Sequence, residues 1–202
     1  MRVKQIIINK AADLATRLGT PNDFPADLLL VFGGIAHFTL PSLSELLRCT
    51  FPDAMVLGCS TAGEITADGV NDGTCTITAI KFDQTRLAQG STCLSGMDDS
   101  FAAGERLGKQ IAAPGLKAVL VLGPGVQING SALVNGMASI IGAGIPITGG
   151  LAGDGGAFKE TFTIGANGVA HNQVVAVGLT VDGLRFGHGS FVGWEPYGPA
   201  CK

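Results

Sequence analysis

The sequence predicts an α/β fold with a mixed β-sheet flanked by helices, built from two β-α-β-β-β pseudo-repeats. This expectation rests on short apolar runs of strand length, on helical patterns between them, and on the recurrence of both along the chain. Residues 28–32 match residues 118–122, 90 positions later, and a glycine follows each run. A period this long indicates two fused halves within one domain, residues 1–202, rather than a solenoid.

The first pseudo-repeat is expected to cover about residues 25–95, after a short opening helix at 11–18. The continuous apolar run at its start is typical of a strand buried on both faces. A helix should follow, because Ser42 and Glu45 form a capping-box sequence in which each side chain bonds the other's backbone amide. The remaining strands of this copy are predicted at residues 54–58, 74–80 and 86–94.

A connecting helix over about residues 99–113 leads to the second pseudo-repeat, at about 116–193. The matching register there changes from 90 to 99, since residues 86–91 resemble residues 185–190, so nine extra residues fall in the second copy. Two-residue turn signals such as Asp182-Gly183 favour hairpins, which is why a purely parallel sheet is not expected. The elements expected in this copy are a helix at 131–141 and strands at 118–122, 146–148, 158–164, 174–181 and 184–192.

Composition limits the possible partners. Hydrophobic residues make up 46% of the chain, which is ample for a core, and charged residues only 14%. Because charges are this few, part of the surface is expected to meet another domain or subunit, and a homo-oligomer is left open. A net charge of −3 without a run of Lys or Arg predicts no nucleic-acid partner. Residues 118–153 carry no charge but are broken by proline and glycine, so no membrane partner is expected either.

The five cysteines are odd in number and have no partner at metal-ligand spacing. They are interpreted as reduced thiols of a cytoplasmic protein, and neither a metal nor a cofactor is predicted. The start of the chain has too short an apolar run for a signal peptide, which agrees with a cytoplasmic location.

Two glycine-rich segments, GCSTAGE at 58–64 and GGLAGDG at 149–155, are followed by KETFTIGANG and VVAVGL. In this order and spacing they resemble the N-terminal half of the FIST domain family. The resemblance implies an intracellular sensory domain that binds small ligands such as amino acids. It also implies that residues 193–202 begin a truncated C-terminal half, so the partner would be the chain's own C-terminal FIST half or another signalling domain.

Glu64 and Asp154 occupy matching positions after a strand and a small-residue turn. If the two turns meet, the carboxylates could bind an amine or a cation; otherwise each only fixes its own turn by accepting backbone amides. Side chains beyond strand ends commonly face a ligand crevice, while glycines let backbone amides approach a ligand carboxylate. The candidate ligand-binding residues are therefore Glu64, Asp154, Gly63, Gly153, Thr39, Asn129, Cys59 and His37.

The leading hypothesis is a non-enzymatic sensory domain whose ligand changes its interface with a signalling partner. One alternative is a hydrolase-like enzyme that uses Cys59 with Glu64 or Asp154, since nucleophiles are often presented just past a strand. Another is a purely structural interaction domain. The enzyme interpretation requires a reactive thiol at Cys59. The ligand-binding interpretation requires the turns of Glu64 and Asp154 to lie close together.

Overall fold

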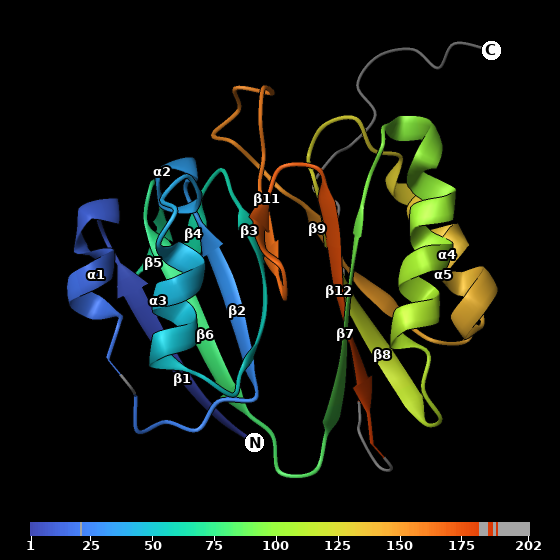
Figure 1. Ribbon diagram of the computed structural model, residues 1–202, viewed down its shortest axis with the longest axis horizontal. Coiled ribbons are helices and arrows are strands. Elements are labelled where there is room, and N and C mark those ends of the chain that lie inside the picture. Colours follow the sequence, from blue (N-terminus) through green and yellow to red (C-terminus); the bar gives the residue numbers. More distant parts are fainter. Residues whose placement is uncertain (21, 182–185, 188, 190–202) are drawn as a thin grey trace.

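The computed structural model describes residues 1–20, 22–181, 186, 187 and 189. Two β-sheets lie face to face between two layers of helices (Figure 1). Both contain parallel and antiparallel neighbours, so the predicted α/β class with mixed sheet flanked by helices is confirmed. The strand predicted at 184–192 falls mostly, and the ending at 193–202 entirely, outside the described residues.

The first unit, residues 2–81, forms a sheet with the order β1-β6-β2-β3. Its helices pack on the outer face of this sheet (Figure 1). The strands are β1 Arg2–Ile8, β2 Leu28–Gly33, β3 Met55–Ser60 and β6 Cys75–Lys81, and the helices are α1 Leu14–Arg17, α2 Ile35–Phe38 and α3 Leu43–Thr50, with a 3-10 turn η1 at Ala11–Asp13.

The second unit, residues 86–180, repeats this plan with the order β7-β12-β8-β9. Each strand has a counterpart at the same place in the first sheet: β1 and β7, β6 and β12, β2 and β8, and β3 and β9. The strands are β7 Arg86–Cys93, β8 Leu116–Gly123, β9 Ile147–Leu151 and β12 Gln173–Thr180, and the helices are α4 Ser100–Ile111 and α5 Gly130–Ile141, with a 3-10 turn η2 at Met97–Asp99.

This strand order confirms the duplication but corrects its boundaries. The strand that begins at Arg86, predicted to end the first copy, opens the second: Arg86 pairs with Thr180 as Arg2 pairs with Lys81. The pseudo-repeats therefore meet at residues 82–85. The boundary was misplaced because glycine and other small residues recur in the strands on both sides of it. The strands that pair to form one unit are far apart in the sequence, so a local pattern does not reveal them.

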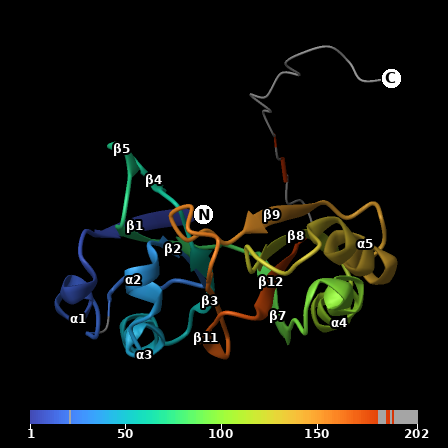
Figure 2. The same cartoon turned by 90° about the horizontal axis from the view of Figure 1, so that it is seen from above.

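Each unit also inserts a short hairpin before its last strand. The hairpin of the first unit, β4 Glu64–Thr66 and β5 Gly69–Asn71, stands away from the body of the molecule (Figure 2). The hairpin of the second unit, β10 Thr163–Gly165 and β11 Gly168–Ala170, instead crosses over and pairs antiparallel with β3. The second unit thus extends the sheet of the first.

Three apolar clusters hold these layers together. One lies between the first sheet and α1 to α3, one between the second sheet and α4 and α5, and one between the two sheets. Representative buried members are Leu29, Leu43 and Leu47 in the first, Leu107, Val119 and Met137 in the second, and Leu57, Cys59, Leu122 and Val175 in the third.

The glycines of the two repeated segments are required by close strand contacts. A Cβ atom on Gly58 would lie 2.1 Å from the carbonyl oxygen of Val31, and one on Gly149 would lie 1.7 Å from that of Val121. Val31 and Val121 are equivalent residues of β2 and β8, so both units need glycine at the same place for the same steric reason.

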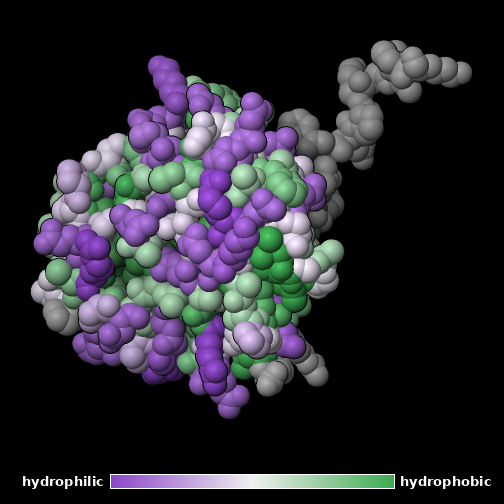
Figure 3. All heavy atoms as spheres, turned by 45° about the vertical axis from the view of Figure 1, so that its right-hand side comes forward, coloured by the Kyte–Doolittle hydropathy of each residue, from purple (hydrophilic) through white to green (hydrophobic). Residues whose placement is uncertain are grey.

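Several large hydrophobic side chains are exposed at the surface. Figure 3 shows hydrophobic residues reaching the surface in several separate places between hydrophilic ones. The most exposed large hydrophobic side chains include Ile65, Val70, Leu151 and Phe158. No helix among the described residues combines the length and the apolar character that a membrane crossing requires.

Ser60, at the end of β3, joins the two units. Its N–H donates to Phe162 O (2.8 Å) and its carbonyl accepts from the Gly153 N–H (2.8 Å). Its hydroxyl donates to Gly153 O (2.7 Å) and accepts from the Phe162 N–H (2.9 Å). Ser60 is fully buried, so these four hydrogen bonds form without competition from water.

We expect Ser60→Ala to lower the free energy of unfolding by about 2 kcal/mol, because it leaves the partly buried Gly153 carbonyl and Phe162 amide without their hydroxyl partner. Urea unfolding followed by circular dichroism measures this change. Ser139→Ala is the control, since Ser139 bonds only the Gly136 carbonyl of its own helix at an exposed position; it should change stability by less than about 0.5 kcal/mol. Equal effects of the two substitutions would contradict the role assigned to Ser60.

Candidate functional site

The two predicted carboxylates are each used within their own turn. Glu64 is only 2% exposed; one of its oxygens accepts from the Thr61 hydroxyl, and the other accepts from the amide and the hydroxyl of Thr74, at 2.9 and 2.8 Å. These bonds tie the start of the β4–β5 hairpin to the start of β6. The Glu64 side chain therefore acts as a buried structural acceptor.

Asp154 fixes the loop that follows β9. Its carboxylate accepts the amides of Phe158 (2.9 Å), Lys159 (2.7 Å) and Glu160 (3.3 Å). These amides, with that of Lys159 first, hold the pKa of Asp154 below its usual range. The arrangement matches the turn-fixing alternative rather than a shared acid pair.

The two turns do meet, but the carboxylates are not equivalent. The Gly153 N–H bonds the Ser60 carbonyl, and a Cβ on Gly153 would lie 2.9 Å from the Ala62 nitrogen. However, the first unit has three residues between β3 and its hairpin, and the second has eleven, residues 152–162. The structural counterpart of Glu64 is consequently Thr163, which like Glu64 begins a hairpin and bonds the start of the last strand, at Gln173.

The remaining small and polar candidates have local structural roles. The Asn129 side chain caps α5 by accepting the Ala132 amide at 3.0 Å. The Thr39 hydroxyl donates to the Ile35 carbonyl at 3.3 Å and lies on the wall of a hollow of about 430 Å³ beside α3 and β11. Gly63 has a φ of 157°, and an added Cβ would lie 3.3 Å from Asp72 Oδ1.

His37 lies fully buried in α2, and neither ring nitrogen forms a hydrogen bond with the described residues. Burial lowers its pKa below the usual value, outweighing the nearby Gly34 carbonyl and the charge of Glu64, both of which favour the protonated ring. His37 is therefore neutral in the folded protein. It is close enough to Glu64 to feel its charge, so the structure brings these two predicted residues into one buried polar region.

Cys59 does not have the surroundings of a nucleophile. Its side chain is buried in the apolar layer between the two sheets, and this burial raises the pKa of the thiol to about 12. A reactive cysteine instead needs a lowered pKa and access to solvent. Among the described residues, no three side chains of His, Cys, Asp or Glu come together as they would at a metal site.

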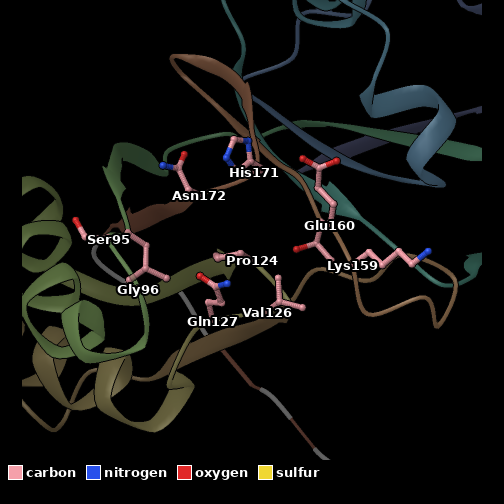
Figure 4. Close-up of a pocket in the computed structure, with 11 residues that line it drawn as sticks. Ser95, Gly96, Pro124, Val126, Gln127, Lys159, Glu160, His171 and Asn172 are labelled. Atoms are coloured by element: carbon pink, nitrogen blue, oxygen red, sulfur yellow. The ribbon is translucent and has the colours of Figure 1, made fainter.

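A more open polar site lies beyond the carboxyl ends of the parallel strands β8 and β9, at what we call the carboxyl edge of the second sheet. Four loops surround a hollow of about 430 Å³, which we call the carboxyl-edge hollow (Figure 4). Ligands of α/β proteins commonly bind in a crevice outside the strand ends, and this volume suits a small molecule. The hollow is lined by Leu94, Ser95, Gly96, Pro124, Val126, Gln127, Lys159, Glu160, Thr161, His171 and Asn172.

The walls of the hollow supply both charges and several hydrogen-bonding groups. Lys159 and Glu160 lie on one side, with the Lys159 side chain extended outward, and His171 and Asn172 lie across from Gln127 (Figure 4). Gln127 has a φ of 56°, a left-handed conformation that is uncommon for a residue with a side chain. Strained backbone of this kind is concentrated at ligand-binding sites.

The loop carrying the two charged residues is firmly held. Asp154 binds its backbone, as described above, and the Thr161 hydroxyl accepts the Gly125 amide at 2.8 Å from the β8–α5 loop. Asp154 thus acts at this site as a positioning residue, through the backbone of Lys159 and Glu160. Its own carboxylate does not line the hollow.

None of the residues that line the hollow was among the predicted site residues. A usable indication was the longer loop of the second copy, since the extra residues fall mostly at 152–162. The other was that His37 and Gln127 stand at equivalent positions of the two copies, 90 residues apart. The first unit fills this place with a buried histidine, whereas the second leaves an exposed glutamine at the edge of an open hollow.

Comparison with known proteins gives a family match and distant structural likenesses. A family model described as the FIST N domain matches residues 27–202. Among solved structures, the crystal structure of cyanuric acid hydrolase from A. caulinodans is similar with a TM-score of 0.36 and 14% sequence identity, over 88% of this chain and 67% of that chain. No curated protein matches.

We expect Cys59 to resist alkylation in the native protein, because a buried thiol with a pKa of about 12 forms almost no thiolate near neutral pH. Iodoacetamide labelling followed by mass spectrometry tests this, with the exposed Cys49 and Cys93 as internal controls. All three should react alike after unfolding. Native labelling of Cys59 as fast as that of Cys93 would revive the nucleophile interpretation.

The neutral state of His37 predicts a stability that depends on pH. Because its folded pKa lies below its unfolded value of about 6.5, the unfolded chain binds the proton first, and stability present above that pH is lost as the pH falls. Urea unfolding between about pH 7.5 and 5 should show this loss, by at most about 1.4 kcal/mol per pH unit for one group. His37→Gln should flatten the dependence, and Ser139→Ala, which removes no titratable group, should not. An unchanged slope in His37→Gln would refute the assignment.

Proposed function

The chain belongs to the FIST N domain family, and from this premise we propose that it is the sensory module of a signalling protein and holds a small zwitterionic ligand in the carboxyl-edge hollow. The observation that carries the proposal is the presence of one cationic and one anionic side chain, Lys159 and Glu160, on the same firmly held loop at a hollow of about 430 Å³.

An amino acid has the chemistry that this hollow complements. Its ammonium group would bind the Glu160 carboxylate, and its carboxylate would bind the Lys159 ammonium, whose long flexible stem allows it to turn inward from the extended position in Figure 4. The Gln127 and Asn172 amides and the His171 ring then offer further donors and acceptors. Few precisely placed polar groups in a concave site are typical of small-molecule recognition.

The same loop connects the hollow to the first unit. Gly153 and Phe162, near its two ends, both bond Ser60 of β3, and three of the residues that line the hollow, Lys159, Glu160 and Thr161, lie between them. A ligand that favours one arrangement of this loop therefore also favours one arrangement of the contact between the units. This coupling gives ligand binding a route to a partner surface.

The cellular setting follows from the thiols. All four cysteines of the described part are unpaired, and two of them are exposed. Such thiols persist in a reducing compartment, which supports sensing of a ligand in the cytoplasm.

We expect at least one amino acid from a panel of the common ones to raise the melting temperature. At a concentration about 100 times its Kd, a ligand adds about 2.7 kcal/mol, or roughly 5–10 °C for a chain of this size. Differential scanning fluorimetry measures the shift. Glu160→Gln and Lys159→Met should each reduce it, because each removes one half of the charge complement.

Lys117→Met serves as the control, because Lys117 is exposed near the start of β8, at the opposite end of the sheet from the hollow. It should bind the ligand as the unmodified protein does. The proposal would be refuted if no amino acid raised the melting temperature, or if the shift were the same in Glu160→Gln, Lys159→Met and Lys117→Met.

A further inference from the structure

The hairpins of the two units are equivalent residue by residue. They begin and end 99 positions apart, at 64–71 and 163–170, and the turn of each contains a glycine with positive φ, Gly69 and Gly168. On this register Ile65 corresponds to Ile164, and Val70 to Val169.

These equivalent residues have opposite environments. Ile164 is 1% exposed and packs with Val169 into the apolar core of the first unit, because β10 pairs with β3. Ile65 and Val70 face each other on the projecting β4–β5 hairpin and are 78% and 74% exposed. Ile164 and Val169 are the apolar side chains with which the second unit docks on the first. Their equivalents in the first unit, Ile65 and Val70, have no cover among the described residues.

The strand that should receive such a hairpin is also open. In the first sheet β3 lies between β2 and β10 and most of it is buried. Its counterpart β9 pairs only with β8 in the part of the chain that the structure describes, and its last three residues are exposed. The second sheet therefore lacks the strand that the first sheet obtains from its neighbour.

The backbone of β9 directs hydrogen-bonding groups toward the side on which another strand could pair. The bonds from the Val119 N–H to Pro146 O and from the Ala152 N–H to Gly123 O fix the alternation of the β8–β9 ladder. The N–H and C=O groups of Gly149 and Leu151 consequently point away from β8. Their counterparts in β3 are Gly58, which lies opposite Ile164, and Ser60, whose amide bonds the chain before β10.

Among the residues 1–181 that the structure describes, apart from residue 21, this edge also lacks the usual protection against pairing. The edge strand β1 carries Arg2 and Lys4, and Gln110 of α4 covers the outer edge of β7 by bonding both the amide and the carbonyl of Ser91 at 3.0 Å. In contrast, β9 reads Ile-Thr-Gly-Gly-Leu, without a charge, and Leu151 is 48% exposed. Exposed edges without charge, proline or cover are the ones that accept another strand.

We propose that the β9 edge and the β4–β5 hairpin together form a docking surface for one further unit of the same repeat. That unit would add its hairpin to β9, with an apolar residue opposite Gly149, and would offer its own third strand to the hairpin that bears Ile65 and Val70. Both elements lie along the same side of the molecule (Figure 2), so a single unit can meet them together.

A third unit is the occupant that the existing interface favours. The contact between the two units is heterologous: one gives a hairpin and the other receives it. Contacts of this kind continue until a ring closes, and the described part of the chain has one hairpin, β4–β5, and one receiving strand, β9, that are not paired with another unit. The proposal is independent of the ligand in the carboxyl-edge hollow.

The probe for the receiving edge is a labelled peptide of residues 161–172, closed by a D-Pro-Gly turn so that the hairpin is preorganised. Fluorescence anisotropy with the full chain should show saturable binding, and amide NMR shifts should concentrate at β9. Leu151→Lys should weaken binding at least about tenfold, because it places a charge on the receiving edge. Val134→Lys makes the same change at an exposed site on α5 and should have no effect.

A peptide with Ile164→Lys should bind as weakly to the unmodified chain as the original peptide binds to Leu151→Lys. The proposal is overturned if the original peptide does not bind, or if the Leu151→Lys and Val134→Lys proteins bind it equally. It is also overturned if sedimentation equilibrium shows the chain alone to be a dimer that either Ile65→Lys or Leu151→Lys dissociates, because the surface then belongs to a second copy.

Discussion

The donation of the β10–β11 hairpin by the second unit to the sheet of the first is the constraint on which the rest of the structure depends. By pairing with β3, β10 buries Ile164 in the core of the first unit and brings Phe162 and Gly153 against Ser60. The first sheet is therefore not formed by its own unit alone, because two of its strands, β10 and β11, come from the second unit. The apolar layer between the sheets then adds burial to an arrangement that directional hydrogen bonds have already fixed.

The donation of this hairpin also explains why the carboxyl-edge hollow forms at the longer loop of the second unit, residues 152–162. The second unit must carry its chain from the end of β9 across to β3 before it can form β10, and residues 152–162 span that distance. A crossing segment without a strand partner must satisfy its amides in other ways, and Asp154 serves that need by accepting the amides of Phe158, Lys159 and Glu160. The same fixed segment presents Lys159 and Glu160 at the hollow.

Local patterns in the sequence were sufficient for the fold class, the duplication and the Asn129 cap, because each depends on periodicity or on a cap a few residues away. The capping box predicted for Ser42 and Glu45 was wrong: α3 begins after Ser42, but the Ser42 side chain makes no cap hydrogen bond. The glycine segments identified the family because close contacts between strands require Gly58 and Gly149. The equivalence of Glu64 and Asp154 was wrong because an inserted loop shifts the register without leaving a local pattern. The hollow was missed because its walls come from four loops that only the tertiary structure brings together.

The two units differ in the segments that follow their equivalent strands β2 and β8. At one position the first unit buries His37 and closes its edge, while the second exposes Gln127 and keeps a hollow. The loop that holds this hollow starts at the last residue of β9, the strand whose outer edge we assign to a further unit. A ligand that orders the loop would therefore also order the end of the docking strand. By linkage, docking at β9 would strengthen ligand binding to the same degree, which gives the sensory and assembly roles a common physical basis.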